Sequence, residues 1–188
     1  MKKRPEACWP RSTSRNSSFI TGVDETPFNL LYPMTAPTPP TSAPTGPDTD
    51  LFRRIEASFS RQGLMQHLGA RLLRVEPGLC EIALPYSDKV TQQQGGFHGG
   101  AMGALADIAG GYAALTLVPE GMEVTTVEYK INFLAACQGG ELRATGHVVK
   151  AGKRVVVTTA QVVHLDQSGK QSDCAVMQQT LVPVPKTY

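Results

Sequence analysis

The chain has 188 residues, enough for one domain with a hydrophobic core and too few for two comfortable ones. Its net charge of +2 comes from mixed signs, whereas a nucleic-acid-binding surface needs a clustered basic face. No apolar run approaches the ~20 residues of a membrane-spanning helix, and the four cysteines show neither a C-x-x-C pair nor zinc spacing. We therefore expect a cytoplasmic protein with reduced thiols, with no metal or cofactor and with neither nucleic acid nor a membrane as partner.

Residues 1–49 are predicted to form a disordered N-terminal tail. Basic residues lie among serines near its start, and six prolines punctuate a Thr/Ser/Ala-rich run over 33–47. Such a segment buries too little apolar surface to offset the entropy of ordering it. A targeting peptide fits poorly, because no apolar stretch follows the basic residues. Translation starting at Met34 is an alternative, which an N-terminal peptide beginning at Met1 in the natural protein would exclude.

The predicted domain covers residues 50–188, and either Asp48 or Asp50 can cap its first helix. Segments with apolar residues at helical spacing and segments of period two are separated by turns such as Pro77-Gly78. In chain order the sequence predicts a helical stripe over 51–68 that is interrupted by Gly63, strands over 70–75 and 79–84, a helix over 99–118, and strands over 127–133, 141–150, 154–165 and 170–182.

Two of these segments decide the expected architecture. The helix 99–118 is apolar on all sides and needs cover on most of them. The strand 127–133 alternates apolar and polar residues, which indicates one solvated face. We therefore expect an α+β fold in which a curved antiparallel sheet wraps around one long central helix.

The segment 94–107 places a glycine-rich turn and a histidine ahead of the long helix and a carboxylate inside it. Asp107 is the only carboxylate between Gly99 and Leu117, and burying its charged form is costly without a partner or a role. Apolar neighbours should raise its pKa and strengthen it as a base. Asp107 is therefore a candidate general base for water or, less favourably, a nucleophile. The alternative is a structural carboxylate that satisfies buried donors.

Gly99 and Gly100 begin the helix, where their backbone N–H groups are expected to be unpaired and to carry the positive end of the helix dipole. Glycine also lets a substrate approach closely, so this pair suits a carbonyl oxygen that develops negative charge. The alternative is that both glycines only permit a tight turn. His98 either orients this turn or hydrogen-bonds near the carbonyl, and a purely structural histidine is an equal alternative.

The chain resembles the PaaI-like branch of the hotdog-fold acyl-CoA thioesterases over about residues 60–182. The resemblance rests on the Q-x-G-G-F lead-in, the T-V-E-Y-K-I-N-F strand, the V-K-A-G-K-R hairpin and an H-G-G-x6-D arrangement: His98, Gly99, Gly100 and Asp107. It implies a hotdog fold and hydrolysis of an acyl-CoA thioester to a carboxylic acid and free coenzyme A. In that scheme Asp107 activates water, and the N–H of Gly99 polarises the carbonyl.

Other positions are candidates for substrate binding. Gln92, with Gln94 as competitor, stands where relatives carry an amide that positions the substrate, and Thr126 stands where they place a hydroxyl near the catalytic water. A polar loop residue and an exposed strand threonine are the ordinary alternatives. Basic side chains on one predicted hairpin either meet the phosphates of coenzyme A or are simply solvated: Lys150, Lys153 and Arg154.

A length argument predicts a dimer. Gly99 and Asp107 are eight residues apart, about 12 Å along a helix axis. Water held by Asp107 therefore cannot reach a carbonyl polarised by Gly99 of the same chain. Two such helices running antiparallel would bring each Gly99 near the other Asp107, so we expect a homodimer with two shared sites. The resemblance implies the same, often with dimers pairing into tetramers.

The main competing function is a non-catalytic acyl-CoA-binding hotdog module, a sensor or a carrier. Asp107 separates the two, because a pure binder does not need the carboxylate. A serine hydrolase would need a G-x-S-x-G elbow, and a zinc hydrolase would need closer histidines, and the sequence has neither. We expect Leu105, Ile108 and Tyr112 in the apolar wall of the pocket. The sequence does not give the depth of the pocket, so the substrate could carry an aliphatic or an aromatic acyl group.

Overall fold

The structure is a computed structural model that describes residues 49–187. The expectations of a start at Met34 and of a disordered tail lie outside the described residues, except that the tail was predicted to reach residue 49, where α1 already begins. The elements in chain order are α1 (Thr49–Phe59), α2 (Gly63–Leu68), β1 (Arg71–Glu76), β2 (Leu79–Pro85), the 3-10 turn η1 (Asp88–Val90), α3 (Gly99–Leu115), β3 (Met122–Phe133), β4 (Glu141–Ala151), β5 (Val156–Leu165) and β6 (Gln171–Pro185).

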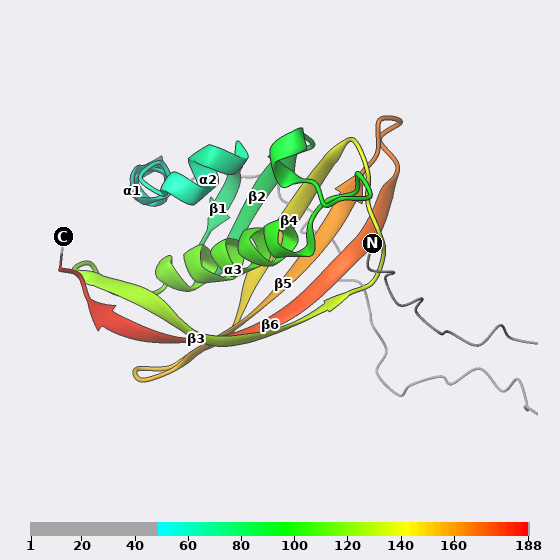
Figure 1. The fold of residues 1–188 in the computed structure, drawn as a ribbon. Coiled ribbons are helices and arrows are strands. Elements are labelled where there is room, and N and C mark those ends of the chain that lie inside the picture. Colours follow the sequence, from blue (N-terminus) through cyan, green and yellow to red (C-terminus); the bar gives the residue numbers. More distant parts are fainter. Residues whose placement is uncertain (1–48, 188) are drawn as a thin grey trace, which may run out of the picture. The chain divides into compact units, whose positions relative to one another are not determined.

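The six strands form one antiparallel sheet in the order β1-β2-β4-β5-β6-β3, which leaves β1 and β3 at its edges. The sheet is curved, and α3 lies along its concave face (Figure 1). On the same side, α1 and α2 add Ile55, Phe59 and Met65 to the hydrophobic core. This is the expected α+β arrangement of a curved sheet around a central helix.

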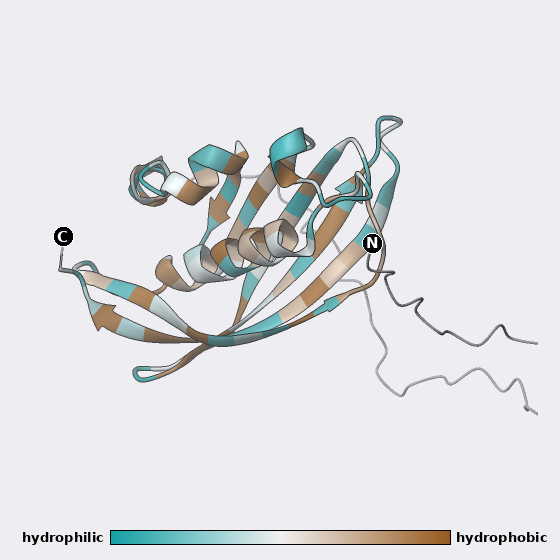
Figure 2. Ribbon diagram, in the orientation of Figure 1, coloured by the Kyte–Doolittle hydropathy of each residue, from teal (hydrophilic) through white to brown (hydrophobic). Residues whose placement is uncertain are grey.

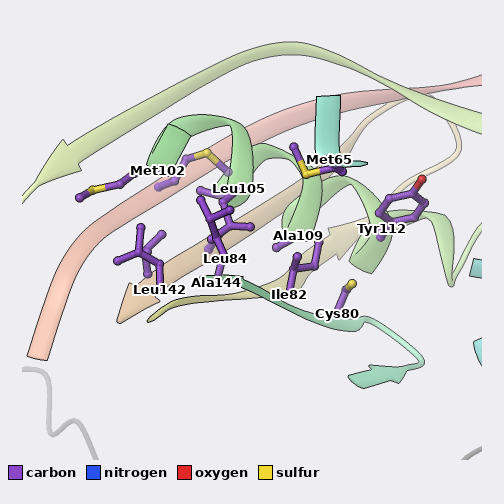
Figure 3. Close-up of a cluster of buried hydrophobic side chains, with 14 of the residues drawn as sticks. Met65, Cys80, Ile82, Leu84, Met102, Leu105, Ala109, Tyr112, Leu142 and Ala144 are labelled. Carbon is purple, nitrogen blue, oxygen red and sulfur yellow. The ribbon is translucent and has the colours of Figure 1, made fainter. Parts of the chain in front are cut away.

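The helix α3 forms the centre of the core rather than one wall of it, because eleven of its seventeen residues are buried. Small residues dominate the helix, and Met102, Leu105 and Tyr112 supply bulk. Side chains on β2 and β4 cover it from the sheet, among them Ile82, Leu84, Leu142 and Ala144 (Figure 3). Polar and apolar residues alternate along the strands, as expected for a sheet with one face on the core (Figure 2).

At Gly146 the strand β4 meets α3 backbone to backbone. A Cβ on Gly146 would collide with the carbonyl group of Ala109. Glycine at this position therefore lets the strand and the helix approach more closely than any side chain would allow. This contact keeps α3 close to the sheet at Ala109, two residues after Asp107.

The end of α3 differs from the prediction, because the helix stops at Leu115 and not at 118. The N–H of Leu117 bonds to the carbonyl of Ala114, three residues back, so the four-residue ladder ends there. Thr116 holds this end in place: its hydroxyl accepts from the Gly78 N–H at 2.7 Å. The first helical stripe is divided near Gly63, as expected, because the chain turns between Phe59 and Gly63.

The prediction of one solvated face on the third strand is wrong. Val127, Tyr129 and Phe133 are exposed by 60, 44 and 52%, although they were expected to face the core. A β-bulge between Thr126 and Glu128 shifts the register at this point. The large side chains lie along α3 but are only partly covered by it: Phe133 lies against Gly99, and the Tyr129 hydroxyl lies near Gly103. The edge strand thus presents an apolar surface that this chain does not cover.

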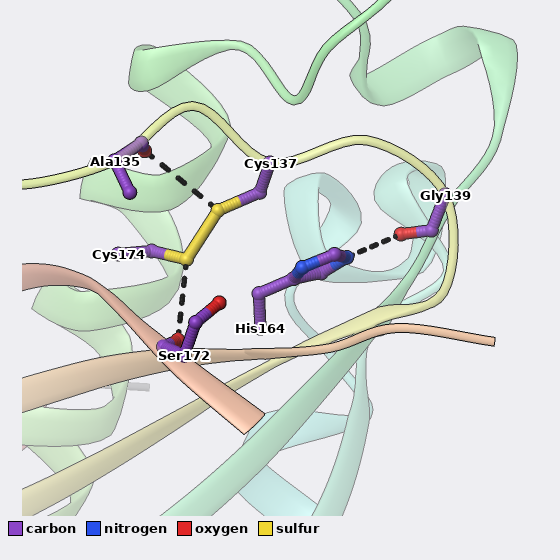
Figure 4. Close-up of a disulfide and its surroundings, with 6 residues drawn as sticks. All are labelled: Ala135, Cys137, Gly139, His164, Ser172 and Cys174. Atoms are coloured by element: carbon purple, nitrogen blue, oxygen red, sulfur yellow. Dashed lines mark hydrogen bonds between the residues drawn. A yellow bond between two sulfur atoms is a disulfide. The ribbon is translucent and has the colours of Figure 1, made fainter. Parts of the chain in front are cut away.

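The expectation of four reduced cysteines is also wrong, because Cys137 and Cys174 form a disulfide (Figure 4). It ties the β3–β4 loop to β6. The same loop is held by His164, whose Nε2 lies 2.8 Å from the Gly139 carbonyl oxygen. The Cys137 carbonyl in turn accepts from the Phe97 N–H at 2.8 Å. The disulfide therefore braces the turn that precedes α3.

Reduction of this disulfide is expected to lower the melting temperature by about 10 °C or more. Its two cysteines are 37 residues apart, and closing a loop of that length restricts the unfolded chain by about 4 kcal/mol in the chain-entropy estimate. Thermal unfolding with and without dithiothreitol measures the effect, and peptide mapping without reduction identifies the bond. The Cys137→Ala/Cys174→Ala double variant is the control. An equal melting temperature of wild type with and without dithiothreitol would contradict the disulfide.

Candidate active site

Asp107 is half-buried on the side of α3 that faces β3 and β6. Its Oδ1 accepts a hydrogen bond from the Thr126 hydroxyl at 2.8 Å and another from the amide of Gln179. The Gln179 amide also lies 2.9 Å from the Thr126 oxygen, so the three side chains form one cluster. Within residues 49–187 the second carboxylate oxygen accepts no hydrogen bond. One oxygen is therefore anchored, and the other is available for chemistry.

Gln179 was not anticipated from the sequence. It is fully buried, and its Oε1 accepts from the Thr158 hydroxyl at 2.9 Å. Room for this pair comes from Gly110, where a Cβ would collide with Gln179 and lie 2.8 Å from the Thr158 oxygen. The signal was present in β6, because Gln179 follows Ala175 and Met177 at period two on the buried face. A polar side chain on a core-facing register needs a partner.

Burial raises the pKa of the Asp107 carboxyl above its ordinary value, and the hydrogen bond from Thr126 partly opposes this. The direction is the one expected from the apolar helix. The low-dielectric surroundings disfavour the charged form, which makes the carboxylate a stronger base.

A cavity of about 430 Å³ opens beside Asp107. Apolar side chains from three elements line it, including Ile108, Val124 and Leu181. Thr126 lies on the same wall. Ile108 and Tyr112 occupy the expected wall, whereas Leu105 is fully buried and does not line the cavity. The cavity suits an apolar group placed directly against a carboxylate.

His98 is the N-cap of α3, and its Nδ1 accepts a hydrogen bond from the Gly100 N–H at 2.8 Å. The expectation that the Gly100 N–H is unpaired is therefore wrong. The Gly99 N–H donates no hydrogen bond within residues 49–187, so it is the available donor at this helix terminus. His98 thus orients the turn. A Cβ on Gly100 would crowd the imidazole, with 2.9 Å to Nδ1, so Gly100 makes room for the cap.

Gly99 and Gln92 line a second cavity, of about 390 Å³, together with Phe133. Asp107 does not line this cavity, and Gly99 does not line the first one. Within one chain the candidate base and the candidate donor therefore face different cavities, which agrees with the distance expected between them along the helix. The structure brings Gln92 to Gly99, and it brings Thr126 to Asp107.

The basic hairpin between β4 and β5 lies outside both cavities. Its side chains are exposed, and none of them lines either cavity: Lys150, Lys153 and Arg154. In the described part of the chain, no three His, Cys, Asp or Glu side chains are placed to hold a metal ion. No helix in residues 49–187 has the length and apolar character needed to cross a membrane.

Residues 94–169 match the sequence profile of the thioesterase superfamily. A putative esterase of Saccharolobus solfataricus is 33% identical over 122 residues, covering 64% of this chain and 85% of that protein. A 1,4-dihydroxy-2-naphthoyl-CoA hydrolase of Listeria monocytogenes is 32% identical over 95 residues, covering 50% of this chain and 77% of that protein. Both alignments span most of the relative.

Solved structures agree with these matches. A thioesterase family protein from Silicibacter pomeroyi has a TM-score of 0.70 and 36% identity, covering 72% of this chain and 99% of that chain. The PaaI protein of E. coli has a TM-score of 0.65 at 21% identity, covering 74% of this chain and 96% of that chain, a likeness of fold. The chain belongs to the thioesterase superfamily and has its hotdog fold, so the protein is a thioesterase.

The Gly110→Ala substitution is expected to destabilise the protein by about 1–3 kcal/mol, because the new methyl group would displace the buried Gln179 side chain. Thioester hydrolysis should fall as well, since Gln179 holds Asp107. Thermal unfolding and thiol release measure the two effects. Gly111→Ala is the matched control, because its Cβ would meet only a Leu181 methyl at 3.9 Å and alanine favours a helix. Equal melting temperatures for the two variants would contradict the packing argument.

Proposed function

We propose that this thioesterase hydrolyses acyl-CoA thioesters to a carboxylic acid and free coenzyme A, with Asp107 as the general base. The observation that carries the proposal is the Asp107 carboxylate itself. It borders a cavity of about 430 Å³ with one oxygen anchored by Thr126 and Gln179, and burial raises its pKa. The Listeria relative is named as a hydrolase of a CoA thioester, which supports this substrate class.

In this proposal the Gly99 N–H stabilises the negative charge that develops on the thioester oxygen. It lies at the positive end of α3, where the helix dipole favours an anion. His98 positions this donor by occupying the neighbouring Gly100 N–H. Gln92 lines the same cavity as Gly99 and would hold the substrate there.

Asp107 acts best by removing a proton from water. Its anchored Oδ1 faces two donors, and Oδ2 can accept the proton of a water in the cavity. The water attacks the carbonyl carbon, the carbon–sulfur bond breaks, and the thiolate leaves as coenzyme A. Attack by the carboxylate itself, to form an anhydride, is the alternative. Single-turnover hydrolysis in ¹⁸O-labelled water separates the two, because only an anhydride pathway can place the label in Asp107.

We propose that two copies of the chain share two sites. The two candidate groups lie about 12 Å apart along α3 and line different cavities of one chain. An antiparallel partner helix would bring them together. The exposed apolar surface of β3 at Val127, Tyr129 and Phe133 supports a partner along this edge. Such dimers can pair further into tetramers.

The basic hairpin between β4 and β5 would contact the substrate only in the assembled dimer. Its cations line neither cavity of one chain, so a phosphate contact would have to reach a substrate bound to the partner: Lys150, Lys153 and Arg154. Phosphate groups of coenzyme A are the chemistry that such cations would meet.

The Asp107→Asn variant is expected to lose at least a hundredfold in kcat, because an amide cannot accept the proton from water. It should melt at a higher temperature than wild type at neutral pH. The folded protein raises the Asp107 pKa, so the native state binds the proton more tightly than the unfolded chain and loses stability as pH rises through that window. Below the unfolded pKa the two melting temperatures should converge. A lower melting temperature for the variant at pH 7 would contradict the raised pKa.

Mixing two inactive variants tests the shared site. Gly99→Pro removes the donor N–H at a helix position that tolerates proline, and His98 before it is already extended. Random reassortment with Asp107→Asn chains makes half of all dimers mixed, and each mixed dimer has one intact site. About a quarter of wild-type activity should return. Each variant alone is the control, and no recovery despite mixed dimers would refute the sharing.

A further inference from the structure

The Gln179 side chain lies between Asp107 on α3 and Thr158 on β5. Its Oε1 accepts from the Thr158 hydroxyl at 2.9 Å. Its Nε2 donates to the Asp107 carboxylate, and it lies 2.9 Å from the Thr126 oxygen and 3.3 Å from the backbone oxygen of Asp107. One uncharged side chain thus connects the candidate base with the middle of the sheet.

The partners of Gln179 permit a single orientation of its amide. An ionised carboxylate and a backbone carbonyl can only accept hydrogen bonds. The Thr126 hydroxyl donates its proton to Asp107 at 2.8 Å, so it also presents an acceptor to the amide. The N–H groups of Gln179 therefore point toward Asp107, and its carbonyl points toward β5, where Thr158 supplies a donor. A reversed amide would place its oxygen against three acceptors.

Burial strengthens this arrangement. Gln179 and Thr158 are both fully buried, so water does not compete for their hydrogen bonds. Gly110 on α3 lies directly over the pair, where a Cβ would collide with Gln179 and lie 2.8 Å from the Thr158 oxygen. A hydrogen bond to a charged acceptor is worth more in such surroundings than in water.

Opposing effects decide whether Asp107 carries a charge. Burial raises the pKa of its carboxyl, and the hydrogen bond from Thr126 lowers it. An N–H that points at a carboxylate also favours the charged form, because the donor stabilises the anion more than the neutral acid. The Gln179 amide is placed to make this contribution. A general base has to be charged at the working pH, so the loss of such a donor would leave more of the enzyme protonated and inactive.

The charged groups around Asp107 oppose one another in the described part of the chain. Arg61, after α1, and Glu123, on β3, line the same cavity, so a cation and an anion act on the carboxylate with opposite signs. Glu123 is itself paired with Lys186 at 3.4 Å. Strands β5 and β6 turn uncharged side chains toward Asp107, and the other titratable groups on α3 and β3 are phenols: Tyr112, which lines the cavity, and Tyr129, near Gly103. The charge of Asp107 therefore depends strongly on its uncharged donors.

We propose that Gln179, aligned by Thr158, is a positioning residue that keeps Asp107 in its charged form at neutral pH. Neither Gln179 nor Thr158 lines the cavity beside Asp107 or the one beside Gly99, so the pair acts through the carboxylate and not on the substrate. The inference rests on the proposed function, because the reaction needs a charged Asp107 only if this carboxylate takes the proton of water.

The acidic limb of the kcat/KM profile tests this role, because it reports the ionisation of the base in the free enzyme. Thiol release from benzoyl-CoA and hexanoyl-CoA gives the profile. Gln179→Met keeps the length of the side chain and removes the donor, so its limb should move to higher pH by about one to two units, the effect of one hydrogen bond lost from a charged group. Thr158→Val keeps the glutamine in place and should move the limb in the same direction by less.

Two further variants serve as controls. Thr158→Ser keeps the hydroxyl and should retain the wild-type limb. Thr159→Val makes the same chemical change as Thr158→Val on the next residue of β5, whose side chain points to the other face of the sheet, and it should also retain the limb. ¹³C NMR of the aspartate-labelled protein follows the titration of Asp107 without catalysis, and Asp107→Asn identifies its signal.

The outcomes separate this inference from the proposed function. An Asp107 titration that stays in place in both Gln179→Met and Thr158→Val overturns the inference, even if kcat falls, because lower activity alone is the mark of a structural role. If Gln179→Met does not fold, Thr158→Val decides in the same way. A titration that moves as expected supports the inference. If the kcat/KM limb of wild type does not coincide with the Asp107 titration, the proposed general base is refuted and the role of Gln179 is kept.

Discussion

The structure depends on one constraint, which is that a carboxylate lies within an almost entirely apolar helix at the centre of the core. Removing Asp107 from water raises its pKa, and only a few donors compensate. Those donors come from β3 and β6, so the sheet must curve far enough to bring both strands to the helix. The same burial that costs stability gives the carboxylate its strength as a base.

The support for this carboxylate extends beyond the residues that could touch a substrate. Thr158 holds Gln179, and Gln179 holds Asp107, while Gly110 leaves the space that the pair occupies. At the other end of α3, His98 takes one backbone donor and leaves its neighbour available. Each candidate group therefore owes its orientation to a side chain that has no chemical step of its own.

The architecture could be predicted from the sequence because its signals are local. The apolar run after His98 and the period-two strands specify a helix within an antiparallel sheet, and an isolated aspartate in that run indicates a site. Gln179 lies 72 residues from Asp107, so only tertiary structure shows their contact. The disulfide and the β-bulge in β3 also depend on pairings that one sequence does not reveal. The partner of the Gly100 N–H is local, but it depends on one rotamer of His98.

The meeting of Gly146 with Ala109 has a consequence for how this scaffold can diversify. At this point the helix meets the strand through main-chain atoms, so their separation here is set by the backbone and not by a side chain. An exchange of the half-buried Ile108, which lines the cavity, does not touch this contact. The lining of the cavity can therefore vary while the contact that places α3 on β4 is kept.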